Sequence, residues 1–352
     1  MKLLNDTISK IEKIDGSFAV ETKRRLDNLT KPLGSLGRLE DLALQVVEIT
    51  RLKNPQLKNK VIFTFAGDHG VTQEGVSAYP KEVTPQMVYN FLRGGAGINV
   101  LARHVGARVV IADLGVAVDL EPDPQLIIKK VGLGTQNMAQ GPAMTKEQAI
   151  ESIENGIAIF EQEFKNGIDI AATGEMGIGN TTAASAITSV ITGQPVEKVT
   201  GKGTGIDDKT LEKKMVVIKK AINTNKPDPK NGIDVLMKVG GYEIGGLTGV
   251  ILAASARRVP IVIDGFISSA AALIAVTIEP KCKDYMIASH FSVERGHRIA
   301  WEYLGLKPIL DLNLRLGEGT GAALAIGIVE AGVKILNEMA TFEAAGVSEK
   351  NA

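Results

Sequence analysis

The feature that most constrains the fold is a repeated pattern of short apolar segments, each followed by a polar or glycine-rich turn and then by a helical stretch. The expected strands lie at residues 61–67, 108–115, 126–131, 168–172, 260–265 and 285–289. This alternation favours an α/β fold with a parallel, doubly wound sheet. Sheets of this kind bind ligands at the carboxyl edge of their strands. The turns that follow the strands are therefore the first places to look for function.

The composition of the 352-residue chain fits this interpretation and argues against several other classes. Hydrophobic residues make up 44% but aromatic residues only 4%, and the 38 glycines suit an aliphatic core with many tight turns. Lys+Arg and Asp+Glu are both 40, so no overall field favours nucleic acid or an anionic membrane. Cys282 is the only cysteine, which excludes an intramolecular disulfide and fits a reducing cytoplasm. The four histidines have no zinc-site spacing, so no metal is expected.

The segments outside the strands predict helices rather than targeting or membrane elements. The first residues lack the apolar region of a signal peptide, and no apolar run reaches the ~20 residues that span a bilayer. We therefore expect a cytoplasmic protein. Helical spacing over 1–28 and 39–52 flanks a Pro/Gly turn, and a capping-box pattern at 145–148 opens a helix that runs to Phe164. The apolar run 235–256 is interpreted as a core helix.

One acidic residue, Glu318, lies between Gly317 and Gly319, just before a helical run of small apolar residues. Glycines on both sides allow a tight turn and leave the carboxylate uncovered by bulky neighbours. The helix N-terminus opens toward whatever occupies the site. The simpler alternative is a carboxylate that only complements the helix dipole. Spacing alone leaves both interpretations open.

Two glycine-rich turns suggest that an anion binds. The turn at 174–182 follows a strand and opens a helix, so its amides and the helix dipole face the same point. It is not a Walker A loop, and its glycines do not match the dinucleotide fingerprint, so binding of NAD is poorly supported. A second turn at 201–208 precedes a helix that carries Lys213 and Lys214. Most helical lysines are solvated, but one beside a phosphate turn is a better candidate for function.

Three further polar residues follow predicted strands directly. Asp68 and His69 end the first strand, and Asp264 ends the strand at 260–265. Their position at the carboxyl edge makes them candidate ligand-side residues. The alternative is structural: Asp68 would cap nearby amides and His69 would satisfy a carbonyl in the core.

Six stretches in this order and spacing resemble one family closely, the nicotinate-nucleotide–dimethylbenzimidazole phosphoribosyltransferases of cobalamin nucleotide-loop assembly. Together they cover nearly the whole chain. They are 31–40 (KPLGSLGRLE), 67–71 (GDHGV), 75–77 (GVS), 141–145 (GPAMT), 174–182 (GEMGIGNTT) and 315–321 (RLGEGTG).

The resemblance implies a reaction and a base that drives it. The family transfers the phosphoribosyl group of nicotinate mononucleotide to 5,6-dimethylbenzimidazole, giving α-ribazole 5′-phosphate and nicotinate without a cofactor or metal. Glu318 would be the general base that takes the N–H proton of the benzimidazole. A β-nucleotide that gives an α-product requires attack on the face opposite the leaving group, as in inverting glycosidases, and so requires no carboxylate nucleophile.

The resemblance also assigns roles to other residues. Glu175 and Lys214 would be secondary catalytic or polar-network groups, and Asp68, His69 and Asp264 would lie near the site. The 5′-phosphate cradle would comprise Gly177, Gly203, Ser292 and Arg315, and the base pocket Tyr79, Gln86, Met176 and Leu316.

The implied architecture is a Rossmann-like sheet of about six strands with a small helical domain built from both termini. We expect a large domain at 30–305 and a small one formed by 1–29 and 306–352. The resemblance also implies a homodimer in which one subunit helps to close the site of the other.

Two departures and two alternatives qualify this prediction. The segment 132–140 differs from the Arg- and Phe-containing version expected there, and Pro32-Leu33 replaces a double proline. The first departure could alter the choice of base, so a purine, another benzimidazole or a phenol remains an alternative substrate. A nucleotide-binding protein without chemistry is the other alternative. Glu318 in its glycine turn argues against it, because a mere binder needs no exposed carboxylate opposite a phosphate cradle.

Overall fold

The computed structural model describes residues 1–203 and 205–348, and its centre is a sheet of six strands in the order β3-β2-β1-β4-β5-β6. Every neighbouring pair is parallel, which confirms the predicted doubly wound parallel sheet. The strands are β1 (Lys60–Gly67), β2 (Ala107–Gly115), β3 (Leu126–Ile128), β4 (Ile170–Met176), β5 (Ile261–Ile263) and β6 (Met286–Ala288).

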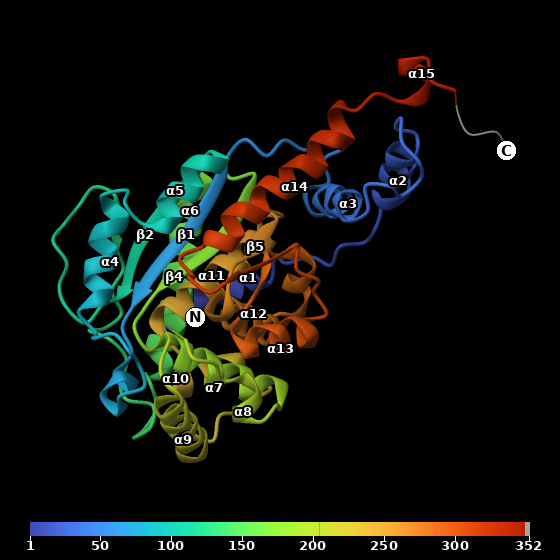
Figure 1. Ribbon diagram of the computed structural model, residues 1–352. Coiled ribbons are helices and arrows are strands. Elements are labelled where there is room, and N and C mark those ends of the chain that lie inside the picture. Colours follow the sequence, from blue (N-terminus) through green and yellow to red (C-terminus); the bar gives the residue numbers. More distant parts are fainter. Residues whose placement is uncertain (204, 349–352) are drawn as a thin grey trace.

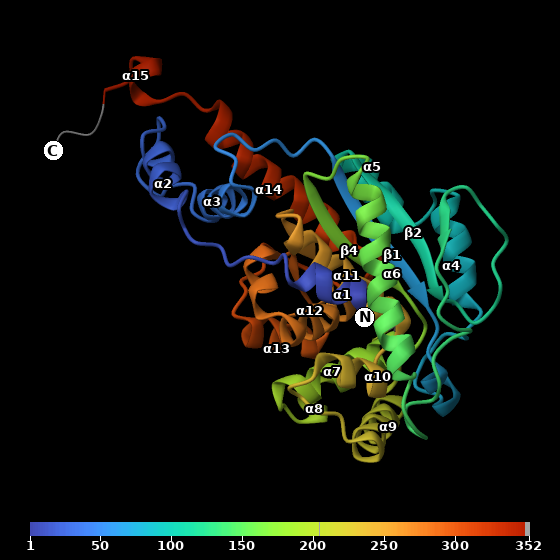
Figure 2. The ribbon, with the colours of Figure 1, turned by 180° about the vertical axis from the view of Figure 1, so that it is seen from behind.

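The sheet is buried on both faces, which explains why its strands read as continuous apolar runs. Along β1, Val61, Phe63 and Phe65 pack into one core with the helices α6, α11 and α12, whereas Ile62 and Ala66 pack into a second core with α5 and α14. Figures 1 and 2 show these helices on opposite sides of the sheet. The helices are α1 (Lys2–Ile8), α2 (Ala19–Asp27), α3 (Arg38–Thr50), α4 (Val83–Leu92), α5 (Gly97–Val105), α6 (Lys146–Phe164), α7 (Asn180–Thr192), α8 (Val196–Val199), α9 (Asp208–Asn225), α10 (Gly232–Val239), α11 (Tyr242–Ala256), α12 (Phe266–Ile278), α13 (Arg295–Leu304), α14 (Thr320–Glu338) and α15 (Phe342–Ala345), with 3₁₀ turns η1 (Gly70–Glu74) and η2 (Pro280–Tyr285).

The strand order reverses between β1 and β4. The chain builds β1, β2 and β3 outward in one direction and then returns to place β4, β5 and β6 on the other side of β1. Connections leave neighbouring strand ends in opposite directions at such a point, and the crevice that this opens is where α/β sheets bind ligands. The crevice lies between the turns that follow β1 and β4.

Two expectations about individual elements need correction. The run 235–256 is not one helix: α10 ends at Val239 and α11 begins at Tyr242, because Gly240 and Gly241 break the backbone path between them. A Cβ on Gly241 would lie 2.3 Å from the His69 ring, so only glycine fits there.

The second correction concerns the sheet. A separate two-stranded parallel sheet, β7 (His290–Ser292) with β8 (Leu310–Leu314), was not predicted. The strand expected at 126–131 ends at Ile128. β3 and β7 have only three residues each, too few to reveal a periodicity. β8 (LDLNL) does alternate apolar and polar residues, so its sequence carries the pattern of a strand that the analysis did not use.

Helices from both ends of the chain form a part that projects from the sheet. In Figures 1 and 2, α14 runs outward from the sheet to α3, α2 and α15. Leu26, Val47 and Leu336 belong to a small core of their own there. The N-terminal α1 instead packs on α6 and α11. The division at residues 29/30 and 305/306 stays a prediction, and residues 349–352 of the smaller unit lie outside the described part of the chain.

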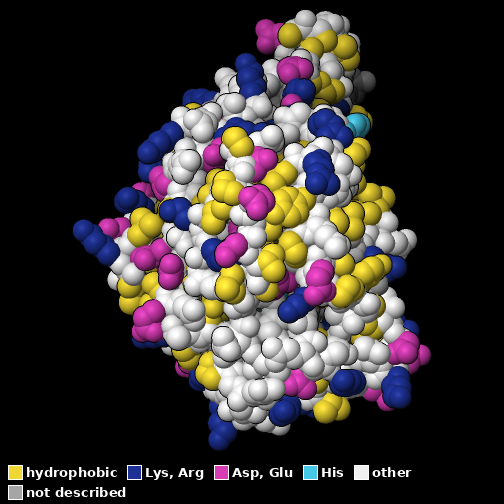
Figure 3. Space-filling model, turned by 90° about the vertical axis from the view of Figure 1, so that its left-hand side faces the viewer, with side chains coloured by type: hydrophobic (Ala, Val, Ile, Leu, Met, Phe, Trp, Pro, Cys, Tyr) yellow, Lys and Arg dark blue, Asp and Glu magenta, His cyan; other side chains and the backbone are white. Residues whose placement is uncertain are grey.

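Helix α14 is long and apolar enough, by length and composition, to cross a membrane. More than half of the apolar stretch is buried inside the protein, however, and the helix packs against α3 and α5. It is therefore a core helix of the fold. On the side that carries α4, Figure 3 shows basic and acidic side chains interspersed, in keeping with the equal numbers of both.

Candidate active site

A cavity of about 360 Å³ lies at the carboxyl edge of the sheet, where the turn after β4 meets the turn before α14. Helix α4 and strand β7 close two of its sides, so segments far apart in sequence meet here. Its wall includes nine of the residues that the resemblance singled out: Tyr79, Glu175, Met176, Gly177, Gly203, Ser292, Arg315, Leu316 and Glu318.

The turn that carries Glu318 has an unusual backbone. Gly317, Glu318 and Gly319 have φ angles of 84°, 62° and 102°, all in the left-handed region that L side chains disfavour. The Glu318 carbonyl accepts a hydrogen bond from Thr64 Oγ1 of β1 at 3.0 Å. A Cβ on Gly174 would lie 2.3 Å from the same carbonyl, so the close approach of β4 requires glycine there. Neighbouring strands thus hold Glu318 in a strained conformation, as is common at functional sites.

The Glu318 carboxyl group is buried and held by main chain. Only 4% of the residue is exposed, and Oε2 accepts a hydrogen bond from the backbone N–H of Ile98 at 3.0 Å. Ile98 lies in the first turn of α5, where free amides favour an anion. Burial and the nearby Asp264 charge raise the pKa of Glu318, and the hydrogen bond from the backbone N–H of Ile98 opposes this rise. The group is thus a stronger base than a solvated carboxylate, in a fixed place.

Asp264 supports Glu318 from behind rather than lining the cavity. Its Oδ2 accepts the N–H of Gly319 at 3.1 Å and its Oδ1 the N–H of Ala322 at 2.8 Å. Gly319 is the N-cap of α14 but has no side chain, so Asp264, the residue directly after β5, accepts the free amides of this helix end instead. Burial raises the pKa of Asp264, and His290 and the accepted amides oppose that rise. Asp264 therefore fixes the backbone on the C-terminal side of Glu318.

Glu175 is the second carboxyl group in the cavity wall, and its surroundings differ. The side chain of Asn180 donates a hydrogen bond to its Oε2. Burial, followed by the charges of Glu243 and Asp264, raises the pKa of Glu175 to about 8. A Cβ on Gly317 would lie 2.3 Å from Glu175 Oε1, so this carboxyl group packs directly against the Glu318 turn. At neutral pH Glu175 is protonated and can donate a hydrogen bond.

The opposite end of the cavity carries the cationic groups. Arg315 Nη1 donates to the Gly203 carbonyl at 3.4 Å, and the guanidinium lies in the cavity wall with Ser292. Lys214 is not in the wall but directly behind it, where its Nζ donates to Thr181 Oγ1 at 2.8 Å. Burial lowers the pKa of Lys214 to about 8, and the charge of Glu294 opposes this. Thr204 of the same glycine turn lies outside the described residues.

Gly177 has a packing reason to be glycine as well as a place in the wall. A Cβ there would lie 2.2 Å from the Gly67 carbonyl, so the turn after β4 can pass this close to β1 only without a side chain. Thr84 of α4 reinforces the same turn by accepting the N–H of Ile178 at 3.1 Å. The turn is therefore fixed by strand β1 on one side and by helix α4 on the other.

One side of the cavity is apolar. Met176 and Leu316 contribute to it from the two turns, and Val83 and Met87 contribute from successive turns of α4. Gln86, which the resemblance assigned to the base pocket, is exposed on α4 and is not in the wall. Residues four apart, such as Val83 and Met87, lie on one face of a helix. Gln86 lies beside that face, and it is its exposure to solvent that separates it from the wall. The segment 132–140 contributes no residue to the wall either.

Asp68 and His69 lie beneath the glycine turn, outside the cavity wall. Asp68 Oδ2 accepts the N–H of Ala117 at 2.8 Å. His69 Nε2 lies 2.6 Å from Oε1 of Glu243, with both side chains almost fully buried. Burial opposes protonation of His69, but the Glu243 charge outweighs it and raises the pKa of His69. Asp68 thus accepts a nearby amide, as its structural interpretation predicts, whereas His69 pairs with the Glu243 carboxylate of α11 and not with the core carbonyl that this interpretation expected.

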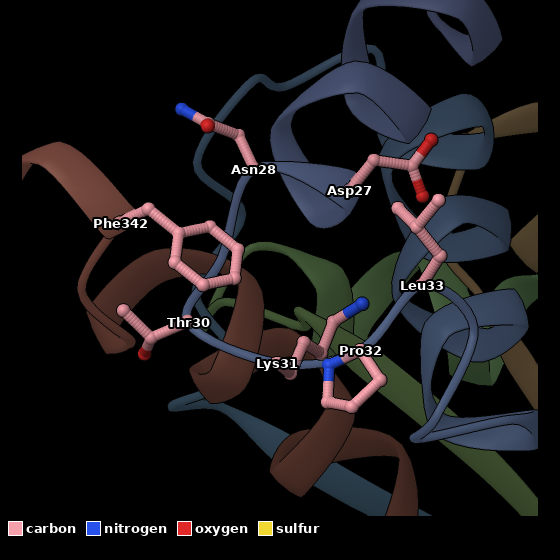
Figure 4. Close-up of a pocket in the computed structure, with 7 residues that line it drawn as sticks. All are labelled: Asp27, Asn28, Thr30, Lys31, Pro32, Leu33 and Phe342. Carbon is pink, nitrogen blue, oxygen red and sulfur yellow. The ribbon is translucent and has the colours of Figure 1, made fainter. Parts of the chain in front are cut away.

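A larger hollow of about 750 Å³ lies elsewhere, in the projecting helical part. Figure 4 shows Phe342 of α15 facing the segment that carries Thr30, Lys31 and Pro32. The Lys31 ammonium is paired with Glu40 at 3.0 Å. This hollow is distant from the carboxyl edge of the sheet, where the positioned carboxyl groups gather. Size alone therefore does not mark the site.

The smaller cavity thus combines a fixed base, an apolar wall and a cationic, glycine-lined end. Such a combination suits a phosphorylated sugar joined to, or meeting, a flat heterocycle. Among the described residues no group of three His, Cys, Asp or Glu side chains has the arrangement of a metal site.

Comparison with known proteins agrees with this geometry. A family model described as "Phosphoribosyltransferase" matches residues 11–347. This chain belongs to that phosphoribosyltransferase family. It is 58% identical over 350 residues to a protein of Chloroflexus aurantiacus and 57% identical over 349 residues to one of Geobacter sulfurreducens, each named nicotinate-nucleotide--dimethylbenzimidazole phosphoribosyltransferase. These alignments cover 99% of the chain and 100% and 99% of the relatives.

A solved structure leads to the same family. The crystal structure of CobT from Thermus thermophilus superposes with a TM-score of 0.91 at 43% identity, covering 94% of this chain and 99% of that one. The resemblance drawn from the six sequence stretches is thereby confirmed.

Several wall residues of this phosphoribosyltransferase escaped the sequence analysis. Asn180 and Thr181 lie inside a recognised glycine stretch, so their proximity to Glu175 was the available signal. Val83 and Met87 could have been found from their helical spacing alone. His290 and Glu294 follow the strand predicted at 285–289, so their position at the carboxyl edge of the sheet was the available signal.

Proposed function

We propose that the protein transfers the phosphoribosyl group of nicotinate mononucleotide to 5,6-dimethylbenzimidazole, giving α-ribazole 5′-phosphate and nicotinate. The single observation that carries this proposal is the position of Glu318. Its buried carboxyl group is anchored on the Ile98 amide between an apolar wall and a cationic, glycine-lined end. A heterocycle on the apolar wall and a phosphate at the cationic end would place the ribose between them.

In the proposed reaction, a benzimidazole nitrogen attacks the anomeric carbon while Glu318 takes the N–H proton of the same ring. The bond from that carbon to the nicotinate nitrogen breaks, and its electron pair leaves with nicotinate. Attack on the face opposite the leaving group inverts the configuration from β to α. Because the pKa of Glu318 is raised, it lies closer to the pH at which the enzyme works, and a base with such a pKa accepts a proton more favourably. Holding both rings in place should supply much of the remaining acceleration.

The other polar groups support this step in distinct ways. Glu175, protonated below about pH 8, is a hydrogen-bond donor beside Glu318 rather than a second base. Arg315 supplies a charge-assisted hydrogen bond to the phosphate. Lys214 adds a positive charge from behind Thr181.

The direct test is to incubate the pure protein with nicotinate mononucleotide and dimethylbenzimidazole and to identify the products by mass. Equimolar nicotinate and α-ribazole 5′-phosphate are expected. Tight binding of the nucleotide without release of nicotinate would refute the proposal and favour a binding protein. A panel of purines, other benzimidazoles and phenols in the same assay decides the base, because competition orders the acceptors by kcat/KM.

We also propose that the protein is a homodimer in which the partner covers the cavity mouth. Tyr79 and Leu316 in the cavity wall are 53% and 60% exposed, so apolar surface at the mouth is left uncovered in the single chain. Water at the mouth would weaken the electrostatic effect of the site. Sedimentation velocity should give twice the 37.4 kDa chain mass. A monomer with full activity would overturn this proposal without affecting the reaction.

A further inference from the structure

Glu294 contacts the phosphate end of the cavity, although the proposed reaction gives it no role. It follows β7 and forms the N-cap of α13, and it is 7% exposed. Its Oε1 accepts the backbone N–H of Gly203 at 2.8 Å. Gly203 is one of the residues expected to bind the 5′-phosphate. An anionic side chain of the protein therefore accepts the same N–H hydrogen bond that the substrate phosphate would accept.

The Gly203 amide is well suited to bind an anion. The residue has a φ of 54°, and its carbonyl is turned to Arg315 at 3.4 Å while its N–H points to Glu294. Lys214 lies behind it: its Nζ is 3.4 Å from where a Cβ on Gly203 would be. A backbone N–H makes one strong hydrogen bond at a time. Glu294 and a phosphate oxygen therefore compete for the same donor.

The second carboxylate oxygen of Glu294, Oε2, indicates that Glu294 does more than stabilise the loop. Oε2 is buried and has no hydrogen-bond partner among the described residues. It lies close to Gly201, where a Cβ would be only 2.1 Å away. A buried carboxylate oxygen without a partner costs free energy. The carboxylate thus satisfies the loop only in part.

We propose that Glu294 is a positioning residue of the phosphate site that holds the Gly203 amide in the free protein and yields it to the 5′-phosphate. The exchange replaces one anion with another beside Lys214 and Arg315. It keeps the glycine loop ordered while the site is empty, and it weakens binding because phosphate must displace a like charge. The inference rests on the proposed function, since it requires a phosphorylated ligand.

Calorimetric titration of Glu294→Gln separates this role from a merely structural one. Glutamine keeps the size and an acceptor for the Gly203 amide but removes the charge. Nicotinate mononucleotide and inorganic phosphate should bind about tenfold more tightly to the variant, because a like charge a few ångströms away is gone. Nicotinate riboside, which lacks the phosphate, should bind equally to both proteins. The matched control is Glu302→Gln, which removes an exposed charge from α13 and should change neither affinity.

Other outcomes count against the proposal. Weaker or unchanged binding of the mononucleotide to a folded Glu294→Gln would mean that Glu294 only braces the loop. Equal tightening of the riboside would mean that the effect is not directed at phosphate. Failure of the wild-type protein to release nicotinate would refute the proposed function instead, whatever the two variants do.

A structure gives an independent readout if Glu294→Gln does not fold. Crystals of the wild-type protein soaked in inorganic phosphate should show a phosphate oxygen on the Gly203 N–H and the Glu294 carboxylate withdrawn. Phosphate bound with the Gly203–Glu294 hydrogen bond intact would overturn the proposal.

Discussion

The two ends of the cavity are built differently. At the acid end, Glu318 is nearly inaccessible and is held by main-chain groups: the Ile98 amide on its carboxylate and Asp264 on the amide that follows it. At the phosphate end, Arg315 is exposed and the Gly203 amide is already engaged by Glu294. One end is complete before substrate arrives, whereas the other must exchange partners when it binds.

This difference suggests a division of labour. Catalytic groups act best when they are fixed before the reaction, because no reorganisation is then needed in the transition state. A binding group can rearrange, provided that the bound ligand compensates for the change. Substitutions at the acid end should therefore reduce kcat, whereas those at the phosphate end should raise KM for the nucleotide. The predictions below test that division, from the largest expected effect to the smallest.

Glu318→Gln should have the largest effect. The amide side chain can still accept the Ile98 hydrogen bond but cannot take a proton, so kcat should fall by roughly two to four orders of magnitude. Nicotinate mononucleotide should bind nearly as well as before, since the phosphate end is untouched. Steady-state kinetics and a calorimetric titration together measure both quantities.

Glu175→Gln is the matched control for that substitution. Because Glu175 is protonated below about pH 8, glutamine resembles its neutral form and can still pair with Asn180. At pH 7 the variant should keep turnover within about tenfold of the wild type, well short of the loss expected for a general base. A loss as large as that of Glu318→Gln would show that both carboxyl groups act in proton transfer, and the contrast between them would fail.

Arg315→Ala tests the opposite end. Loss of a charge-assisted hydrogen bond to phosphate, about 1.5–3 kcal/mol, should raise KM for the mononucleotide by roughly 10- to 150-fold. The value of kcat at saturation should change little, because the guanidinium would bind the phosphate and take no part in the proton transfer. A fall in kcat at unchanged KM would place Arg315 in the chemistry and would break the division between the ends.

Asp264→Asn should disturb the acid end more gently. One of the two amides at the start of α14 loses its acceptor, so Glu318 is less well fixed and kcat should fall about tenfold. Removing the Asp264 charge also lowers the pKa of Glu318, so the acid limb of the kcat profile should shift to lower pH. Asp113→Asn is the control: Asp113 is equally buried, accepts the amides of Gly115 and Val116 at the end of β2 and pairs with Lys130, but it is not in the cavity wall and is not among the groups that shift the pKa of Glu318. The same shift in that variant would remove the positioning role.

Glu175 also predicts how stability depends on pH. Between about pH 4.5 and 8, folded Glu175 keeps a proton that the unfolded chain has lost. Stability should therefore fall as pH rises through this window, by up to about 1.4 kcal/mol per pH unit, and level off above it. Glu175→Gln has no carboxyl group at this position to titrate. In denaturant titrations, the free energy of unfolding of the variant should therefore rise relative to that of the wild type from pH 5 to 8. Parallel curves would mean that Glu175 is ionised in the folded protein at neutral pH.

Much of this architecture was predictable because local chemistry and the overall fold agree. Apolar strands buried on both faces reveal themselves in sequence, and the capping box that opens α6 is formed by Thr145 and Gln148 as expected. The Glu318 turn was recognisable since two glycines beside one carboxylate have few structural explanations. Spacing alone could not exclude a role for Glu318 limited to the helix dipole, and its place in the cavity wall supplies that distinction.

The rest depends on contacts between distant segments. Glu294 meets Gly203 across 91 residues, and Asp264 meets Gly319 across 55. No periodicity or local motif encodes such meetings, and β7, with three residues, is too short to show a periodic pattern. Which residues of α4 line the cavity, Gln86 or its neighbours, depended on which face of this helix packs toward the cavity.

That choice gives the smallest and most specific prediction. Met87 is in the apolar wall, whereas Gln86 beside it is exposed to solvent. Met87→Ala should raise KM for dimethylbenzimidazole by about three- to tenfold, because small losses of apolar contact in a pocket are worth roughly 1 kcal/mol or somewhat more. Gln86→Ala should leave KM within about twofold, and neither variant should change KM for the mononucleotide. If Gln86→Ala has the larger effect on the base, α4 presents the opposite face to the bound heterocycle, and the apolar side of the cavity must be redrawn around Gln86.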